Sequence, residues 1–410
     1  MTNDIKTTEA KPLCGVYKKC SGCQLMNLSY DEQLSLKQSK IIKLMGKFCH
    51  VDEIIGMENP MHYRNKTSAV FKMTKPNNRI ISGVYQSSTG GIVTNDECVL
   101  ENKRSSAIIK HLRKLMPEFK LYPYDDYTGK GNLKHVMVRY GKTSGEYMVV
   151  LVTATPILPK GNELAKALQA KFPEIKTVVQ SISDSRDKMM LGEREKVLFG
   201  DGYITDTLCG KKFIISPRSF YQVNPTQTEK LYSLAIEMAD IKKTDRVLDC
   251  YCGIGTIGLI ASDKAGEVLG VESNSQAIKD AKKNAALNKV KNAGFVCSDT
   301  GKLLTSLAEE GEGADVVLLD PARAGCDKAT LDALLKMMPR RIVYISCNPE
   351  TQERDIKALI KGGYKATKVQ PVDMFPFTLH CECVVCLSRE KADDYIRISV
   401  HTKDLRPKAN

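Results

Sequence analysis

Residues 341–349, RIVYISCNP, place a cysteine where simple packing would not need one. An apolar, strand-like run ends on Ser346 and Cys347, and the Asn348-Pro349 pair that follows is a turn former. A cysteine that only filled a buried strand would not need a polar turn behind it. Three roles are open for Cys347 on this evidence: core filler, metal ligand, or nucleophile held at the rim of a sheet.

A second run, LHCECVVCL, carries a carboxylate in a strongly apolar strand. Alternation along the strand puts Cys381, Cys383 and Val385 on one face and Glu382 on the other. A carboxylate in such a strand is costly unless it is paired or functional. The cysteines of this strand are expected in the core rather than around a metal. His380 faces the same side as Glu382, as its partner or as a competing base.

The segment LDCYCGIGTIGL has the form of a strand, a glycine turn and a helix start. Asp249 ends the strand, and Gly253 and Gly255 let the backbone turn tightly against a ligand at the helix N-terminus. The run lacks the third glycine of a dinucleotide fingerprint. Glu272 ends the next strand, where an acid can hydrogen-bond both hydroxyls of a ribose.

Asp299 in CSDT and Asp320 in LLDPAR end the next two strands. Four acid-tipped strands resemble the class I S-adenosylmethionine methyltransferase plan, with an NAD site or a chance Gly-x-Gly as the alternatives. Enzymes of this class that methylate exocyclic amines usually place an aromatic residue in the tetrad after the fourth strand. Here the tetrad is Asp320-Pro321-Ala322-Arg323, which favours a carbon or oxygen acceptor.

Methylation of a ring carbon such as C5 of a pyrimidine needs two protein groups. A thiolate must add to C6 so that C5 becomes nucleophilic, and a base must afterwards remove the C5 proton. Cys347 fits the first role, since it lies at the ligand-binding edge and near a helix N-terminus. The helix dipole and Arg323 would both favour its thiolate. Glu382 fits the second role.

Near the N-terminus, CGVYKKCSGC gives Cys14, Cys20 and Cys23 in the pattern C-x5-C-x2-C, and Cys98 in NDECVL is the expected fourth member. Three thiols this close favour zinc or an iron-sulfur cluster over packing. The spacing itself does not separate the two. The pattern differs from the C-x3-C-x2-C of radical S-adenosylmethionine enzymes, which speaks against radical chemistry.

These residues need elements that bring them together, and the pattern changes along the chain. From about Asp245 onward strands and helices alternate, which predicts a doubly wound parallel sheet with ligands at its carboxyl edge. The earlier half has short alternating runs that favour an α+β arrangement with antiparallel strands. Near the join, Asn224 is expected to cap a helix that starts at Pro225. We therefore expect two domains, 1–215 and 216–410.

The composition is that of a soluble globular protein with an excess of positive charge. The formal net charge of +13 suits a polyanionic partner, although many basic proteins bind no nucleic acid. No run of 18 apolar residues and no signal-peptide pattern is present, so a cytoplasmic location and reduced cysteines are expected. The side chains considered for contact with RNA phosphates, each equally consistent with a solvated face, are Tyr63, Arg64, Lys66, Lys134, His135 and Arg139.

Over nearly its whole length the sequence resembles the RNA uracil-5-methyltransferase family, on the runs SPRSFYQVN, LDCYCGIGT, LLDPARAG, ISCNP and DMFPFTLHCE. The resemblance implies that Cys347 is the nucleophile and Glu382 the general base, acting on a base flipped out of its RNA. Phe220 matches a position that packs near the target base. The positions that it implies for the S-adenosylmethionine pocket are Gln222, Tyr251, Thr256, Glu272, Asp299 and Asp320.

The resemblance also implies a 4Fe-4S cluster on Cys14, Cys20, Cys23 and Cys98, because the ribosomal-RNA branch of the family carries one on this pattern. A structural role is expected, since the methyl transfer needs no electron. Many ribosomal-RNA members begin with a small β-barrel, for which the motif at Cys14 leaves no room. The expected protein is a monomeric 23S rRNA uridine-C5 methyltransferase with no membrane association and no obligate protein partner. The rivals are a tRNA uridine-C5 methyltransferase and a non-catalytic iron-sulfur RNA-binding protein.

Overall fold

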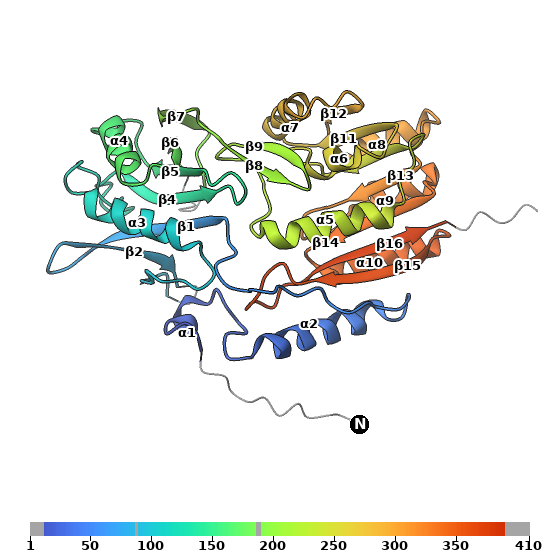
Figure 1. Cartoon of the computed structure of the whole chain (residues 1–410), viewed down its shortest axis with the longest axis horizontal. Coiled ribbons are helices and arrows are strands. Elements are labelled where there is room, and N and C mark those ends of the chain that lie inside the picture. Colours follow the sequence, from blue (N-terminus) through green and yellow to red (C-terminus); the bar gives the residue numbers. More distant parts are fainter. Residues whose placement is uncertain (1–11, 87–88, 186–189, 390–410) are drawn as a thin grey trace, which may run out of the picture.

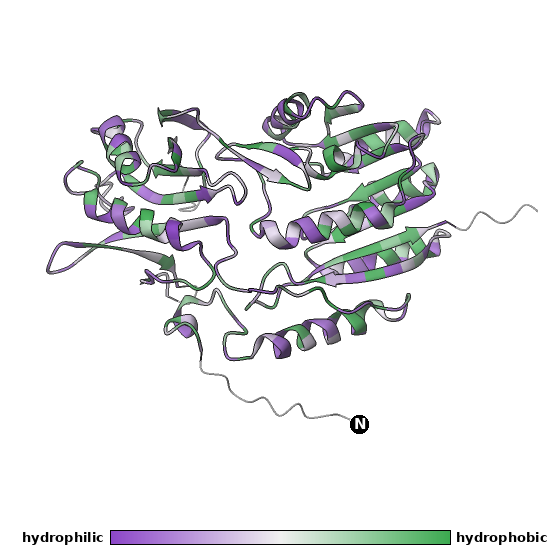
Figure 2. Ribbon diagram, in the orientation of Figure 1, coloured by the Kyte–Doolittle hydropathy of each residue, from purple (hydrophilic) through white to green (hydrophobic). Residues whose placement is uncertain are grey.

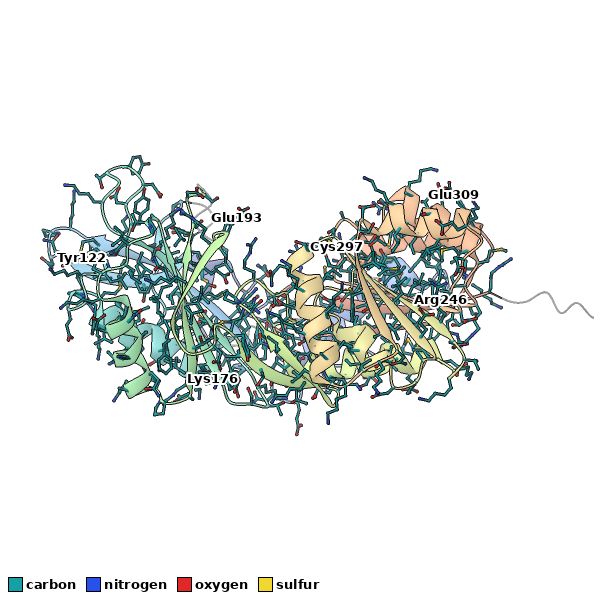
Figure 3. The ribbon with its side chains drawn as sticks, turned by 90° about the horizontal axis from the view of Figure 1, so that it is seen from above. Tyr122, Lys176, Glu193, Arg246, Cys297 and Glu309 are labelled. Atoms are coloured by element: carbon teal, nitrogen blue, oxygen red, sulfur yellow. The ribbon has the colours of Figure 1, made fainter. Side chains whose placement is uncertain are left out.

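The protein is built from two seven-stranded sheets that stand side by side. The computed structural model describes residues 12–86, 89–185 and 190–389. A hairpin of β8 (Ile204–Leu208) and β9 (Lys211–Ile215) lies between the sheets (Figure 1). Seen from above, Tyr122, Lys176 and Glu193 lie on one lobe, and Arg246, Cys297 and Glu309 lie on the other (Figure 3).

The first sheet has the strand order β3-β2-β1-β4-β5-β6-β7. Every pair in it is antiparallel, as the sequence predicts, except β5 and β6. That pair is parallel because helix α4 (Gly161–Lys171) crosses over between the two strands. Helix α3 (Lys103–Leu115) packs with α4 over the same apolar core. The strands are β1 (Lys66–Thr74), β2 (Arg79–Tyr85), β3 (Ile92–Val93), β4 (Leu133–Tyr140), β5 (Tyr147–Thr153), β6 (Ile175–Ile182) and β7 (Arg194–Phe199).

The second sheet has the order β12-β11-β10-β13-β14-β16-β15. Its first five strands are parallel, as predicted, but β16 runs antiparallel to both of its neighbours. The reversal arises because a loop, and no helix, joins β15 to β16. The strands are β10 (Arg246–Cys250), β11 (Glu267–Glu272), β12 (Ala293–Cys297), β13 (Val316–Leu319), β14 (Arg341–Ser346), β15 (Lys365–Val372) and β16 (Glu382–Ser388).

Helices cover both faces of the second sheet. Helix α5 (Pro225–Ala239) begins where predicted, with the Asn224 side chain accepting a hydrogen bond from the backbone N–H of Gln227. Five further helices follow α5 in the part of the chain that the structure describes, and the sequence pattern predicts all of them except α8. They are α6 (Thr256–Ala261), α7 (Ser275–Leu287), α8 (Thr300–Glu309), α9 (Lys328–Met337) and α10 (Pro349–Lys361). In Figure 2 the strands of this sheet are largely green, as expected for strands buried on both faces.

Helix α2 (Tyr30–Met45) belongs to the first half by sequence but packs against the second. It lies along α10 and β15 (Figure 1), and its Ile41 and Met45 are fully buried in the core under the second sheet. A capping box between Ser29 and Glu32 fixes its start. No helix within the described ranges is long and apolar enough to cross a membrane.

Candidate active site

A cavity of about 570 Å³ opens at the carboxyl edge of the second sheet. Cys347, which follows β14, and Glu382, which begins β16, both line it. The two strands are neighbours, so residues 35 positions apart in the sequence meet at one edge. The structure thus brings together the two groups that the sequence suggests for nucleophile and base.

Five of the six residues expected around the methyl donor line the same cavity: Gln222, Tyr251, Thr256, Glu272 and Asp320. Asp299 does not. Its carboxylate caps helix α8 by accepting a hydrogen bond from the Lys302 backbone N–H at 3.0 Å. The acid after β12 therefore caps the N-terminus of α8, a helix that the sequence pattern does not predict.

The glycine turn after β10 has the conformation that its composition predicts. Gly253 and Gly255 adopt φ angles of 55° and 81°, in the left-handed region that favours glycine. Gly258 in the following helix approaches Asp249 closely, since its backbone N–H donates to Asp249 Oδ2 at 2.8 Å. A Cβ atom on Gly258 would lie 2.7 Å from that oxygen. The turn and the acid beneath it are therefore built as one unit.

The Asn-Pro turn behind Cys347 fixes the end of β14. The backbone N–H of Asn348 donates to Ser346 Oγ at 3.1 Å, and its side chain donates to the Arg323 backbone oxygen at 2.9 Å. Thr351 Oγ1 donates to the same oxygen at 3.1 Å. These bonds tie the cysteine turn to the loop that carries Arg323, so both sides of the thiol are positioned together.

The Cys347 thiol is half-buried, and its pKa lies above the ordinary value of 9.0. Burial is the largest cause and the carboxylate of Glu382 the next, whereas Arg323 acts in the opposite direction. Arg323 favours the thiolate, as expected, but burial and the neighbouring acids outweigh it, so the pKa of the thiol is raised.

Glu382 is 2% exposed, and burial raises its pKa well above the ordinary range, with Asp320 adding to the effect. The predicted alternation along β16 is confirmed, because Cys381, Cys383 and Val385 pack in one core and Val384 lies in the other. The cysteines of this strand are core residues, as expected. Glu382 faces the cavity from the opposite side.

Two further acids beneath the cavity, Asp320 and Asp249, also have raised pKa values. Burial raises the pKa of Asp320 to about 7. Burial also raises the pKa of Asp249 to about 7, against the hydrogen bond from Gly258, and repulsion from Asp320 and Glu272 adds to the rise. Such a cluster of desolvated acids favours a cationic ligand.

His380 does not line this cavity. Its ring faces Arg323 Nη2 at 3.1 Å and packs edge-on against Phe375. It borders a neighbouring hollow of about 380 Å³, together with Cys347 and Arg323. Burial and the nearby cations lower its pKa below the ordinary 6.5. The ring is therefore a poorer candidate for the base than Glu382.

Two aromatic residues of the cavity were missed by sequence reasoning. Tyr232, a buried residue of α5, lines the cavity together with Gln222 and Thr256. Phe375 lies in the loop between β15 and β16. The DMFPF run itself could have indicated Phe375, since it precedes Glu382 directly. Tyr232 gave no such signal, because a tyrosine on an amphipathic helix usually belongs to the core.

The four N-terminal cysteines lie in one neighbourhood. Cys14, Cys23 and Cys98 border one small apolar cluster beside the short helix α1 (Tyr17–Cys20). Burial raises the pKa of Cys23 to about 12, and repulsion from each of the other three thiolates contributes to that rise. Within the described ranges, no group of three potential ligands is arranged closely enough to hold a single metal ion.

The fold and the acid-tipped edge together define a class I S-adenosylmethionine methyltransferase. A crystal structure of the tRNA (uracil-54, C5)-methyltransferase of Pyrococcus abyssi with S-adenosyl-L-homocysteine superposes with a TM-score of 0.76 at 30% identity, covering 90% of this chain and 86% of that one. The sequence model described as tRNA (uracil-5-)-methyltransferase matches residues 29–390. The chain therefore belongs to this family of RNA methyltransferases.

Curated relatives agree with this assignment at the level of the reaction class. An uncharacterized RNA methyltransferase of Oceanobacillus iheyensis is 42% identical over 384 residues, which cover 92% of this chain and 83% of the relative. Another from Listeria innocua is 41% identical over 388 residues, covering 94% of this chain and 85% of the relative.

Proposed function

We propose that this protein transfers a methyl group from S-adenosylmethionine to C5 of a uridine in 23S rRNA. The observation that carries the proposal is the meeting of Cys347, Glu382 and Asp320 on one cavity at the carboxyl edge of the second sheet. A thiol and a buried carboxyl on adjacent strands are the pair that C5 methylation needs. When bound, S-adenosylmethionine supplies the methyl group as an electrophile.

The Cys347 thiol must first lose its proton to solvent, because only the thiolate adds to C6 of the base. Addition forms the S–C6 bond and places the electron pair at C5, where the methyl group is accepted. Glu382 then takes the proton from C5, and the S–C6 bond breaks to restore the ring and the thiolate. The raised pKa of Glu382 suits this step, since a stronger base removes a carbon-bound proton more readily.

Glu382 must be ionised before it can act as a base, and two groups favour that form. Arg323 lowers the pKa of both Glu382 and Cys347. A cationic ligand in the cavity would do the same for the surrounding acids. We infer that Gln222, Tyr251, Thr256, Glu272 and Asp320 hold this ligand.

The four-cysteine group supports ribosomal over transfer RNA. Cys14, Cys20, Cys23 and Cys98 fit a 4Fe-4S cluster in donor type and neighbourhood, because four thiols from two segments approach one another. The cluster would cross-link the two segments beside the RNA-binding side.

A tRNA uridine remains the second candidate, favoured by the structural similarity to the Pyrococcus abyssi tRNA enzyme. The division into an RNA-binding region (1–215) and a catalytic region (216–410) remains a prediction, as do a cytoplasmic location and a monomeric state. Helix α2 modifies that division, because it packs on the catalytic side.

Release of tritium from RNA labelled at C5 of uridine tests the reaction. Wild-type protein with S-adenosylmethionine should release tritium from a 23S rRNA transcript, and Cys347→Ala should release none. Release from tRNA transcripts alone would favour the second candidate. No release from either RNA would overturn the uracil-C5 assignment. Iron and acid-labile sulfide in an anaerobic preparation test the cluster, and stoichiometric zinc would refute it.

A further inference from the structure

Two cations of the first sheet stand directly opposite each other. Lys66 of β1 and Arg139 of β4 are Cα partners in the antiparallel register, so their side chains project to the same face. That face also carries Met137 and Met148, which pack into the core shared with the second half. The pair therefore lies on the side of the first sheet that is turned toward the catalytic half.

Neither side chain has a carboxylate partner among the described residues. Arg139 is 7% exposed. Its Nη2 donates to the Ser219 backbone oxygen at 2.6 Å, while its Nε has no partner. Burial lowers the pKa of Arg139 to about 10. Burial also lowers the pKa of Lys66, and repulsion from Arg139 and Arg64 adds to this effect.

Such an arrangement destabilises the protein by itself. Like charges directly opposite each other on a sheet repel, and a buried charge without a counterion is costly. An acid in place of either residue would remove both costs. We propose that Lys66 binds a phosphodiester of the RNA strand beside the target nucleotide, with the buried guanidinium of Arg139 opposite it adding positive charge. The inference deepens the proposed function and rests on it.

The position of the pair relative to the cavity supports this ligand. Ser219, which Arg139 contacts, precedes Phe220, and Phe220 is 65% exposed and lines the catalytic cavity. Asn65, which precedes Lys66, donates from its side chain to the Gln222 backbone oxygen at 3.0 Å. A base stacked on Phe220 would thus have its backbone near the cation pair. Guanidinium and ammonium groups are the usual ligands of RNA phosphates.

The test compares RNA affinity with stability in Lys66→Met. Loss of one phosphate contact on a single strand should reduce the slope of log K against log salt concentration by about 0.7, and weaken binding roughly tenfold. The melting temperature should stay the same or rise, because the repulsion from Arg139 is removed. Lys66→Arg should restore both the slope and the affinity.

Lys72→Met is the matched control, because Lys72 lies on the same strand, is exposed, and is six residues away from the pair. It should leave the slope nearly unchanged. Equal losses in both variants would show a diffuse charge effect and overturn the subsite. A fall in melting temperature together with RNA affinity in Lys66→Met would also overturn it, since that result indicates a structural role.

The same RNA distinguishes failure of this inference from failure of the proposed function. The binding measurements use the transcript from which wild-type protein releases tritium. If no transcript supports release, the proposed function fails. If release is normal and the salt slope of Lys66→Met equals that of the wild type, only the phosphate subsite fails. Binding of S-adenosylhomocysteine should be equal in all variants.

Discussion

The two sheets hold buried charge of opposite sign on the sides that serve the cavity. The second sheet presents Asp249, Asp320 and Glu382, whose pKa values burial raises. The first sheet presents Lys66 and Arg139, whose pKa values burial lowers. In both places the largest cause is desolvation of the charged form. This contrast is the one expected if the second sheet binds a cationic methyl donor and the first binds a polyanionic RNA, as we propose.

A third buried charge shows what the chain does where no ligand is expected. Lys37 of α2 and Asp373 are both fully buried and lie 2.6 Å apart. Lys37 Nζ also donates to the Phe375 backbone oxygen at 3.0 Å, and the Tyr30 hydroxyl donates to Asp373 Oδ2 at 2.9 Å. Every charge in this network has partners. Paired buried charge thus holds the loop that carries Phe375, whereas the charges for which we propose ligands lack such a network.

The largest expected effect is on the acid side, in Glu382→Gln. Without a base the C5 proton stays in place, so turnover should fall about 100- to 10,000-fold. The RNA adduct should accumulate, visible as a protein–RNA band that survives denaturing electrophoresis. Cys347→Ala, which cannot form the adduct, is the control. Normal turnover without a trapped band would move the base to another residue, and His380→Ala would then be the next variant to measure.

The buried ion pair of Lys37 and Asp373 provides the next test. Lys37→Met should lower the free energy of unfolding by about 3–5 kcal/mol, because it leaves the Asp373 carboxylate buried without a cation. Denaturant unfolding measures the change. Lys328→Met removes a lysine from an exposed pair with Asp332 and should cost at most about 1 kcal/mol.

Lys66→Met sharpens this contrast. It removes a half-buried lysine that has no carboxylate partner among the described residues, so it should cost no stability. A similar loss of stability in Lys37→Met and Lys66→Met would erase the distinction between paired and unpaired buried charge. Missing ion-pair partners would then not distinguish a ligand site from a structural one.

The sequence predicts local periodic features well and long-range electrostatics poorly. The strand ends that carry Glu272 and Cys347 follow from alternation and turn signals, as does the Asn224 helix cap. The raised pKa of Cys347 does not, because it depends on burial in the folded protein and on Glu382 from a different strand. The role of α2 is equally hidden, since the partner of Lys37 lies 336 positions away.

Asp299 shows a different reason for failure. A family pattern assigns an acid after each strand to the ligand, yet an acid at a strand end is also a good helix cap. Which role applies depends on whether a helix follows, and α8 has few strong signals in TGKLLTSLAE. The sequence correctly indicates an acid with a specific role at position 299. It does not indicate that a helix N-terminus, and not the ligand cavity, lies beside that acid.

Asp320→Asn tests the acid side as a binding site. It should weaken S-adenosylmethionine binding about 10- to 100-fold, because a charged hydrogen-bond partner is lost from the cavity. Wild-type affinity should rise with pH through about 7, as Asp320 ionises and can pair with the cationic ligand. Calorimetry at pH 6 and pH 8 measures both effects. Asp299→Asn, which keeps its helix cap outside the cavity, should bind normally; an equal loss there would restore Asp299 to the site.

The last test is the stability of Asp249→Asn. The folded protein holds the Asp249 proton up to a pKa of about 7, whereas the unfolded chain releases it near the ordinary 3.8. Ionisation therefore favours the unfolded state increasingly as pH rises from about 4 to 7, and the cost is constant above that. The variant lacks this cost and can still accept the hydrogen bond from Gly258. It should be more stable than the wild type by about 4 kcal/mol at pH 8 and equal to it near pH 4. Thermal unfolding at the two pH values measures this difference. A variant that is less stable at pH 8 would show that the folded protein already stabilises the ionised Asp249 carboxylate. The cavity acids would then not need a cationic ligand to offset their charge.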